Sequence, residues 1–166
     1  MCMVEISTTS PLDIACAASL LQNMNISTES VSIARGREYI LEFLLLNHPL
    51  DCPICDRGSE CDLQEQANRY GNDCSKFVEN KRSVQDKEIG FFVKTVMTRC
   101  IHCTRCIRFL DDIANDNILG TIGRGGETEI GTYLSKFLNN PLSGNIIDLC
   151  PVGALLSKPY NYLTRS

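Results

Sequence analysis

Three closely spaced cysteines and one distant cysteine constrain this chain more than any other feature of its sequence. Cys100, Cys103 and Cys106 follow the spacing C-x2-C-x2-C, and Cys150 stands far downstream, directly before Pro151. Bacterial-type ferredoxins hold [4Fe-4S] clusters with this spacing and a remote Cys-Pro. A zinc site more often uses pairs of cysteines. The pattern therefore favours a tetranuclear iron–sulfur site.

A second cysteine-rich loop precedes this motif. His48, Cys52, Cys55 and Cys61 lie within fourteen residues, which is enough to complete a zinc site or to hold a [4Fe-4S] cluster. The spacing leaves both alternatives open. If His48 binds a cluster, its neutral imidazole in place of an anionic thiolate should raise the reduction potential.

Ten cysteines in 166 residues also raise the possibility of disulfides, but nothing in the sequence indicates secretion. Cys74 has no partner at ligand spacing, and we expect it to be structural or free. Cys2 and Cys16 are separated by thirteen residues, so their spacing alone fits buried core cysteines as well as ligands.

The remaining composition excludes several classes of function. A net charge of −4 argues against a nucleic-acid partner, and the longest apolar run, residues 40–46, is too short to cross a bilayer. The N-terminus shows no signal or transit peptide. The two histidines, His48 and His102, both accompany cysteines that are better used as ligands, so no hydrolytic site is indicated. One-electron transfer is the chemistry that remains.

Local patterns predict a mixed α and β structure. Apolar runs predict short strands around residues 3–6 and 14–17, joined by a polar loop, and the glycine-rich residues 119–130 predict a β-hairpin turn rather than a nucleotide site. Helical spacing or composition predicts helices at residues 32–46, 62–70 and 107–113. Three arginines near the triplet are expected to form a solvated basic edge or to offset cluster charge: Arg99, Arg105 and Arg108.

Three segments carry a specific resemblance that covers almost the whole chain. Residues 48–64 (HPLDCPICDRGSECDLQ), 98–109 (TRCIHCTRCIRF) and 143–155 (SGNIIDLCPVGAL) resemble the N-terminal iron–sulfur region of the 75 kDa subunit family of respiratory complex I. The resemblance implies an α+β fold in three parts. Residues 1–28 would be part of a [2Fe-2S] ferredoxin-like (β-grasp) domain, 29–95 a helical and loop-rich [4Fe-4S] domain, and 96–166 a bacterial-ferredoxin-like [4Fe-4S] domain.

The same resemblance implies two ligand sets. One [4Fe-4S] cluster would be held by His48, Cys52, Cys55 and Cys61, and a second by Cys100, Cys103, Cys106 and Cys150. Cys2 and Cys16 match the last two of the family's four [2Fe-2S] ligands. The other two would be supplied in trans by another polypeptide or be lost with the cluster.

The implied function is electron relay in NADH:ubiquinone oxidoreductase. Expected partners are a flavin- and NADH-binding subunit, a chain with the missing ferredoxin-like half, and a chain with the family's C-terminal domain. The expected location is the matrix-side arm at the mitochondrial inner membrane, or the cytoplasmic membrane face of a bacterium, without direct insertion. The rival functions are a soluble ferredoxin-type carrier and a zinc-stabilised interaction module.

Overall fold

The computed structural model describes residues 2–7 and 10–160, which pack into two compact units. The first unit combines Met1–Leu46 with Glu65–Glu79, and the second combines Asn47–Gln64 with Asn80–Ser166. All eight cysteine and histidine residues of the two predicted [4Fe-4S] ligand sets fall in the second unit. That unit therefore positions both candidate sites.

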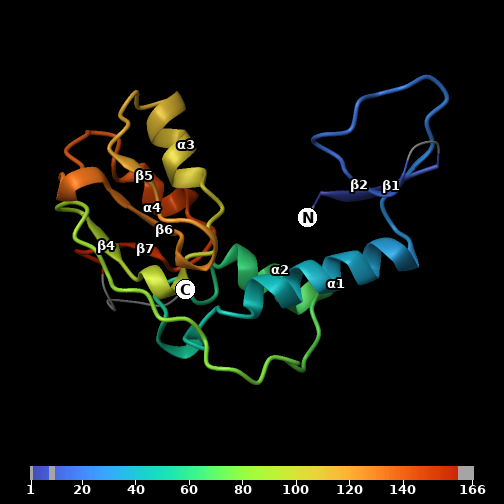
Figure 1. The fold of residues 1–166 in the computed structure, drawn as a ribbon, viewed down its shortest axis with the longest axis horizontal. Helices are drawn as coiled ribbons and strands as arrows, with labels where there is room; N and C mark the ends of the chain where they lie inside the picture. The colour runs from blue at the N-terminus through green and yellow to red at the C-terminus, as the bar shows by residue number, and fades with distance from the viewer. Residues whose placement is uncertain (1, 8–9, 161–166) are drawn as a thin grey trace. The chain divides into compact units, whose positions relative to one another are not determined.

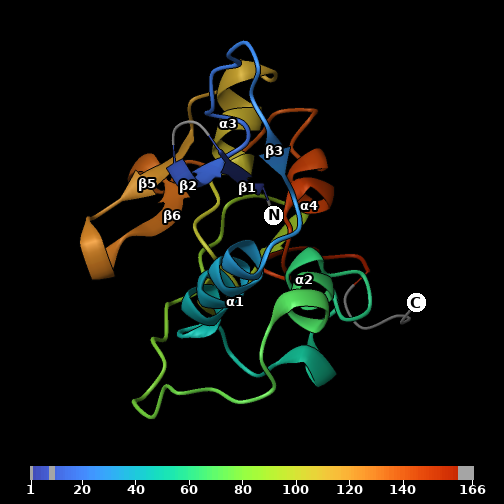
Figure 2. The same ribbon diagram turned by 90° about the vertical axis from the view of Figure 1, so that its right-hand side faces the viewer.

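The elements confirm the expected mixture of helices and strands (Figures 1 and 2). The strands are β1 (Met3–Ile6), β2 (Ser10–Ile14), β3 (Ile26–Ser27), β4 (Val93–Thr95), β5 (Leu119–Ile122), β6 (Glu129–Thr132) and β7 (Leu155–Ser157). The helices are α1 (Val31–Leu45), α2 (Asp62–Tyr70), α3 (Arg105–Asp112) and α4 (Asn145–Leu149). Short 3-10 turns are η1 (Cys52–Ile54), η2 (Met97–Arg99), η3 (Gly125–Glu127) and η4 (Tyr133–Ser135). The three predicted helices correspond to α1, α2 and α3.

The first unit is a small antiparallel sheet, in the order β2-β1-β3, covered by α1. Burial of Val4 and Ile6 on β1 and of Ile33 and Leu41 on α1 forms its core. The helix comes so close to the sheet at Gly36 that a Cβ there would lie 2.6 Å from the Met3 Cε. A side chain at position 36 would therefore require the end of the flexible Met3 side chain to move.

The strand predicted around residues 14–17 is wrong, because the second strand lies earlier. β2 ends at Ile14, whose Cα pairs with that of Met3, and the backbone amides of Ala17 and Ala18 then donate to the Ile14 carbonyl at 2.9 and 3.1 Å. The chain reverses at this turn, so the apolar residues after Ile14 do not extend the strand. Part of the predicted connecting loop, residues 8–9, lies outside the described residues.

In the second unit a short antiparallel ladder between β4 and β7 joins the two ends of the predicted ferredoxin-like region. Val93 pairs with Ser157 and Thr95 with Leu155, and the Val96 amide continues the ladder by donating to the Ala154 carbonyl at 2.8 Å. Cys100 follows the β4 end of this ladder, and Cys150 precedes the β7 end. The ladder therefore brings the remote cysteine back to the triplet.

The glycine-rich segment forms the predicted hairpin. β5 and β6 pair antiparallel, with Leu119 opposite Thr132 and Ile122 opposite Glu129. Gly123 has a φ of 78°, and a Cβ there would lie 2.5 Å from the Glu127 carbonyl oxygen, so the turn requires glycine. Beside this hairpin, α3 and α4 contact each other and bury Leu110 and Ile146 completely. Together these elements form the frame that carries the cysteine loops of the Cys100 site.

Candidate metal centres

The first candidate centre, called here the Cys100 site, consists of Cys100, Cys103, Cys106 and Cys150. Cys100 ends the turn η2, Cys106 lies in the first turn of α3, and Cys150 is the C-terminal cap of α4, where its amide donates to the Ile146 carbonyl at 3.1 Å. His102 and Thr104 adopt positive φ angles of 54° and 58°. These left-handed residues curl the triplet loop, which lets three cysteines from one short segment face a common space.

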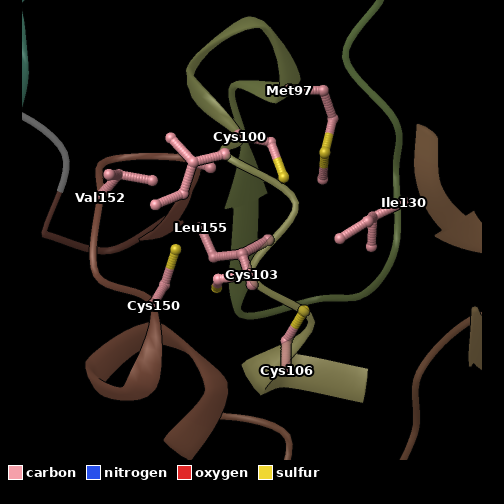
Figure 3. A pocket seen from close by; sticks show the side chains of 10 residues that line it. Met97, Cys100, Cys103, Cys106, Ile130, Cys150, Val152 and Leu155 are labelled. Atoms are coloured by element: carbon pink, nitrogen blue, oxygen red, sulfur yellow. The ribbon is translucent and has the colours of Figure 1, made fainter. Parts of the chain in front are cut away.

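One cavity collects the four cysteines of the Cys100 site. Figure 3 shows the labelled cysteines around this space, with Cys100 approaching from the triplet loop and Cys150 from the end of α4. The empty space, counted out to where the cavity opens to solvent, is about 360 Å³. The other lining residues are all apolar: Met97, Ile101, Ile130, Val152, Ala154 and Leu155. Cys106 and Cys150 are buried, whereas Cys100 and Cys103 are partly exposed.

Two thiols of this site, those of Cys100 and Cys106, have raised pKa values. Burial, and to a smaller extent charge repulsion from Cys150, Cys100 and Cys103, raises the pKa of Cys106 to about 12. Burial also raises the pKa of Cys100, although the backbone amide of His102, 3.4 Å from the Cys100 Sγ, opposes this change. Metal ligation requires thiolates. The donor set therefore fits a group of metal cations that would neutralise several thiolates together.

The second candidate centre, called here the His48 site, consists of His48, Cys52, Cys55 and Cys61. Cys52 begins the turn η1, Cys55 caps its end, and Cys61 directly precedes α2. A sharp bend between the last two cysteines contains Ser59 with a φ of 77°, whose amide donates to the Gln64 side-chain oxygen at 3.2 Å. The loop is thus closed back onto the start of α2.

The His48 site also surrounds one cavity, of about 280 Å³ counted in the same way. Its four ligand candidates share this cavity with Asp51, Gly58, Gln64, Arg99 and Gly153. Cys55 and Cys61 are buried, whereas Cys52 is exposed at the surface. Burial raises the pKa of Cys61, against smaller opposing effects of backbone hydrogen bonds from Gln64 and Leu63. The lining of this cavity is more polar than that of the Cys100 site.

His48 is suited to act as a neutral ligand. Its Nδ1 is buried and finds no hydrogen-bond partner within residues 2–7 and 10–160. Burial lowers the pKa of His48 below its ordinary value, and the positive charges of Arg99 and Lys81 lower it further, against a smaller opposing effect of Asp51. The imidazole is therefore neutral at pH 7, with a nitrogen lone pair available to a metal.

The loops of the two sites contact each other within the second unit. The Cys61 thiol donates to the Pro151 carbonyl at 3.5 Å, and the Arg57 guanidinium donates to the carbonyls of Ile147 and Asp148 at 3.3 and 3.1 Å. Gly153 has no room for a side chain, because a Cβ there would overlap with the Cys55 Sγ. The cysteine loop of the His48 site is therefore fixed against the segment around Cys150.

The chemistry of the donors fits metal ligation at both sites. Each set of four donors lines one cavity. Cysteine thiols, alone or with one imidazole, are ligands that both zinc and iron–sulfur clusters accept. The described residues do not bring three His, Cys, Asp or Glu side chains together around one point.

The other residues singled out from the sequence lie elsewhere. Cys2 and Cys16 are both exposed at one end of the β1–β2 hairpin, where the Ala15 amide donates to the Cys2 carbonyl at 2.8 Å. Cys74 is exposed in the first unit. Arg105 is also exposed and forms an ion pair with Asp62 at 3.3 Å.

Sequence reasoning missed the contributions of Arg57, Gly153 and Arg99. Arg99 precedes the triplet, yet it lines the other site. Arg57 acts through hydrogen bonds to backbone carbonyls, and Gly153 acts by allowing two loops to approach each other. Neither contribution produces a recognisable pattern in the sequence.

Two family models match the segments that contain the two candidate centres. Residues 37–76 match the NADH-ubiquinone oxidoreductase-G iron–sulfur binding region, and residues 90–156 match the ferredoxin-like domain of NADH-quinone oxidoreductase subunit 3. The whole chain is 57% identical over 166 residues to the NADH-ubiquinone oxidoreductase 75 kDa subunit of Reclinomonas americana. The chain belongs to the family of this iron–sulfur subunit. The matched region has ferredoxin-like iron–sulfur domains of mixed α and β content.

Other members of the 75 kDa subunit family are similarly related. The mitochondrial NADH dehydrogenase [ubiquinone] iron-sulfur protein 1 of Solanum tuberosum is 52% identical over 166 residues. The chain spans only about a quarter of these relatives, 24% of the Reclinomonas protein and 22% of the Solanum protein. A crystal structure of an NAD+-reducing [NiFe]-hydrogenase superposes with a TM-score of 0.85 at 25% identity, covering 98% of this chain and 70% of that chain.

Proposed function

We propose that this chain is the electron-relay part of an NADH:ubiquinone oxidoreductase, passing single electrons from the NADH and flavin side toward quinone. The observation that carries this proposal is the pair of four-donor cavities in one unit of a chain that belongs to the 75 kDa subunit family. By itself the chain would carry electrons, and the complete oxidoreductase activity would belong to the assembled complex.

In this proposal each cavity holds one [4Fe-4S] cluster, ligated by the four residues of the His48 site and the four of the Cys100 site. When bound, such clusters accept and release single electrons. The chain supplies the thiolates and the imidazole, and the apolar side chains Met97, Ile130 and Val152 line the Cys100 site. Burial and hydrogen bonds to sulfur, such as that from the His102 amide, would tune the potential.

Cys2 and Cys16 would contribute two ligands to a [2Fe-2S] centre whose other ligands come from outside residues 1–166. Their position at the same end of one hairpin supports this role. The first unit would then be part of a β-grasp ferredoxin-like domain, and residues 96–166 a bacterial-ferredoxin-like domain. The proposed partners are a flavin- and NADH-binding subunit and the polypeptide segments that complete the ferredoxin-like and C-terminal parts.

The proposed location is the matrix-side peripheral arm at the mitochondrial inner membrane, or the equivalent cytoplasmic face in a bacterium. The mitochondrial relatives support this location. Within the part of the chain that the structure describes, none of the helices has the length and apolar character needed to cross a membrane.

Substitution His48→Cys tests the ligand set and the relay together. An anionic thiolate in place of a neutral imidazole disfavours the reduced, more negative cluster, so the midpoint potential of this centre is expected to fall. The potential of the Cys100 site should stay nearly unchanged. Redox titration of the purified complex, followed by low-temperature EPR, measures both potentials.

Cys74→Ser is the matched control, since Cys74 is exposed and lies in the other unit. An unchanged potential in His48→Cys would show that His48 is not a ligand. If NADH reduced neither tetranuclear centre of the unaltered complex, while a stronger chemical reductant did, the relay function itself would be wrong.

A further inference from the structure

Arg99 is a charged side chain in an unusual position. Only 4% of its surface is exposed, and among the described residues no other Arg, Lys, Asp or Glu is buried. Burying a guanidinium is costly unless it is paired and hydrogen-bonded, so such a residue needs a structural or functional reason. The two other arginines near the triplet, Arg105 and Arg108, are both exposed.

The guanidinium of Arg99 lies at the His48 site, although its neighbour in sequence is Cys100. Its Nε donates to the Asp51 Oδ2 at 3.1 Å, and its Nη1 donates to the Gly153 carbonyl at 3.4 Å. Arg99 lines the cavity of the His48 site and is absent from the residues that line the cavity of the Cys100 site. The positive charge of Arg99 therefore acts mainly on the His48 site.

The partners of Arg99 belong to two different loops. Asp51 stands between His48 and Cys52, and Gly153 follows Cys150 by three residues. Arg99 thus ties the His48 loop to the Cys150 loop, beside the contact between the Cys61 thiol and the Pro151 carbonyl. A planar guanidinium with several donors can hold two such partners at once, which the single ammonium of lysine does less well.

The charge of Arg99 also has an electrostatic consequence. Asp51 is the acidic residue paired with it, but the Asp51 side chain is 34% exposed, so water screens its charge more than that of Arg99. A buried positive charge beside a metal cluster stabilises the form with one more electron, because field effects are strong in a poorly solvated site.

We propose that Arg99 is the positioning residue that holds the two ligand loops together and the fixed charge that raises the reduction potential of the cluster in the His48 site. This inference rests on the proposed function, since it concerns the cluster that the His48 site would hold. It predicts an effect that differs between the two sites of one chain.

Substitution Arg99→Gln in the purified complex tests the proposal by redox titration and EPR. The reduced-to-oxidised ratio of the His48-site centre at a fixed poise is expected to fall at least about tenfold, equivalent to about 59 mV for a one-electron couple. The potential of the Cys100-site centre should shift less.

Two further variants serve as controls. Arg99→Lys keeps the positive charge, so the His48-site centre should keep most of its potential. Arg105→Gln, next to the same triplet but exposed, should shift neither centre.

The reciprocal substitution Asp51→Asn separates the charge effect from folding. It removes the negative partner and should raise the potential of the His48-site centre, opposite to Arg99→Gln. If Arg99→Gln lost iron, the loss would support the positioning role, and Asp51→Asn would still show whether the net charge of the Arg99–Asp51 pair affects the potential of the His48-site centre. Normal signals with unchanged potentials in both variants, or equal shifts at both centres, would overturn this inference. Absence of cluster signals in the unaltered complex would instead refute the proposed function.

Discussion

Replacing Cys106 by alanine is expected to remove about four irons per chain and the EPR signal of one tetranuclear centre, following the iron count of a [4Fe-4S] cluster. Cys106 is buried at the start of α3 and shares its cavity with the other three thiols of the Cys100 site. Three remaining thiolates would leave one iron without a cysteine ligand, and among the other residues that line the cavity only the weakly donating thioether of Met97 carries a sulfur atom. Iron analysis and EPR of the purified complex measure this loss.

The control for Cys106→Ala is Cys74→Ser, which changes an exposed thiol in the first unit and should retain all iron.

The burial of Cys106 leads to a second expectation, about the protonation of its thiol. In the metal-free chain the pKa of Cys106 is raised to about 12, so its thiol should stay protonated at neutral pH. Full iron content in the Cys106→Ala complex would exclude this residue as a ligand.

Gly153→Ala is expected to disrupt the His48 site although it changes no ligand. The new Cβ would overlap with the Cys55 Sγ and would also lie 3.3 Å from the Arg57 Cβ. Relief requires the His48 loop to move away from the Cys150 loop. Overpacking of this kind costs about 1–3 kcal/mol, and here the strain falls directly on a ligand thiol. The expected result is loss of the His48-site EPR signal and of up to about four irons per chain.

Gly144→Ala is the matched control for this glycine. Gly144 caps α4 in the same segment, its φ of −61° suits any residue, and a Cβ there meets no atom within 4 Å. This variant should keep both centres. If Gly153→Ala bound iron as the unaltered complex does, the close approach of the two loops would not be needed for the cluster.

The sequence predicted the regular elements with strong local signals. α1, α2 and α3 have helical spacing or composition, and the glycines of residues 119–130 predict the β5–β6 hairpin. The strand expected around residues 14–17 failed because the chain turns after Ile14, and apolar composition cannot distinguish a strand from a turn of small residues. The β4–β7 ladder was not predicted, since strands of three residues carry little periodicity.

The two ligand sets were proposed from spacing and resemblance, and the structure places each set around one cavity. The residues around them could not be predicted. Arg99 stands next to Cys100 in sequence, and only the fold shows that its guanidinium reaches the other site. Gly153 is important because two loops approach each other there, which depends on tertiary packing rather than on any local pattern.

The most direct test of the account is the content of iron, zinc and acid-labile sulfide in this chain, isolated within its native complex, together with low-temperature EPR after reduction. Two tetranuclear clusters predict about eight irons and about eight sulfides per chain, with tetranuclear signals, and about ten irons if Cys2 and Cys16 share a completed binuclear centre. Zinc without sulfide would contradict the electron relay and would leave a structural module.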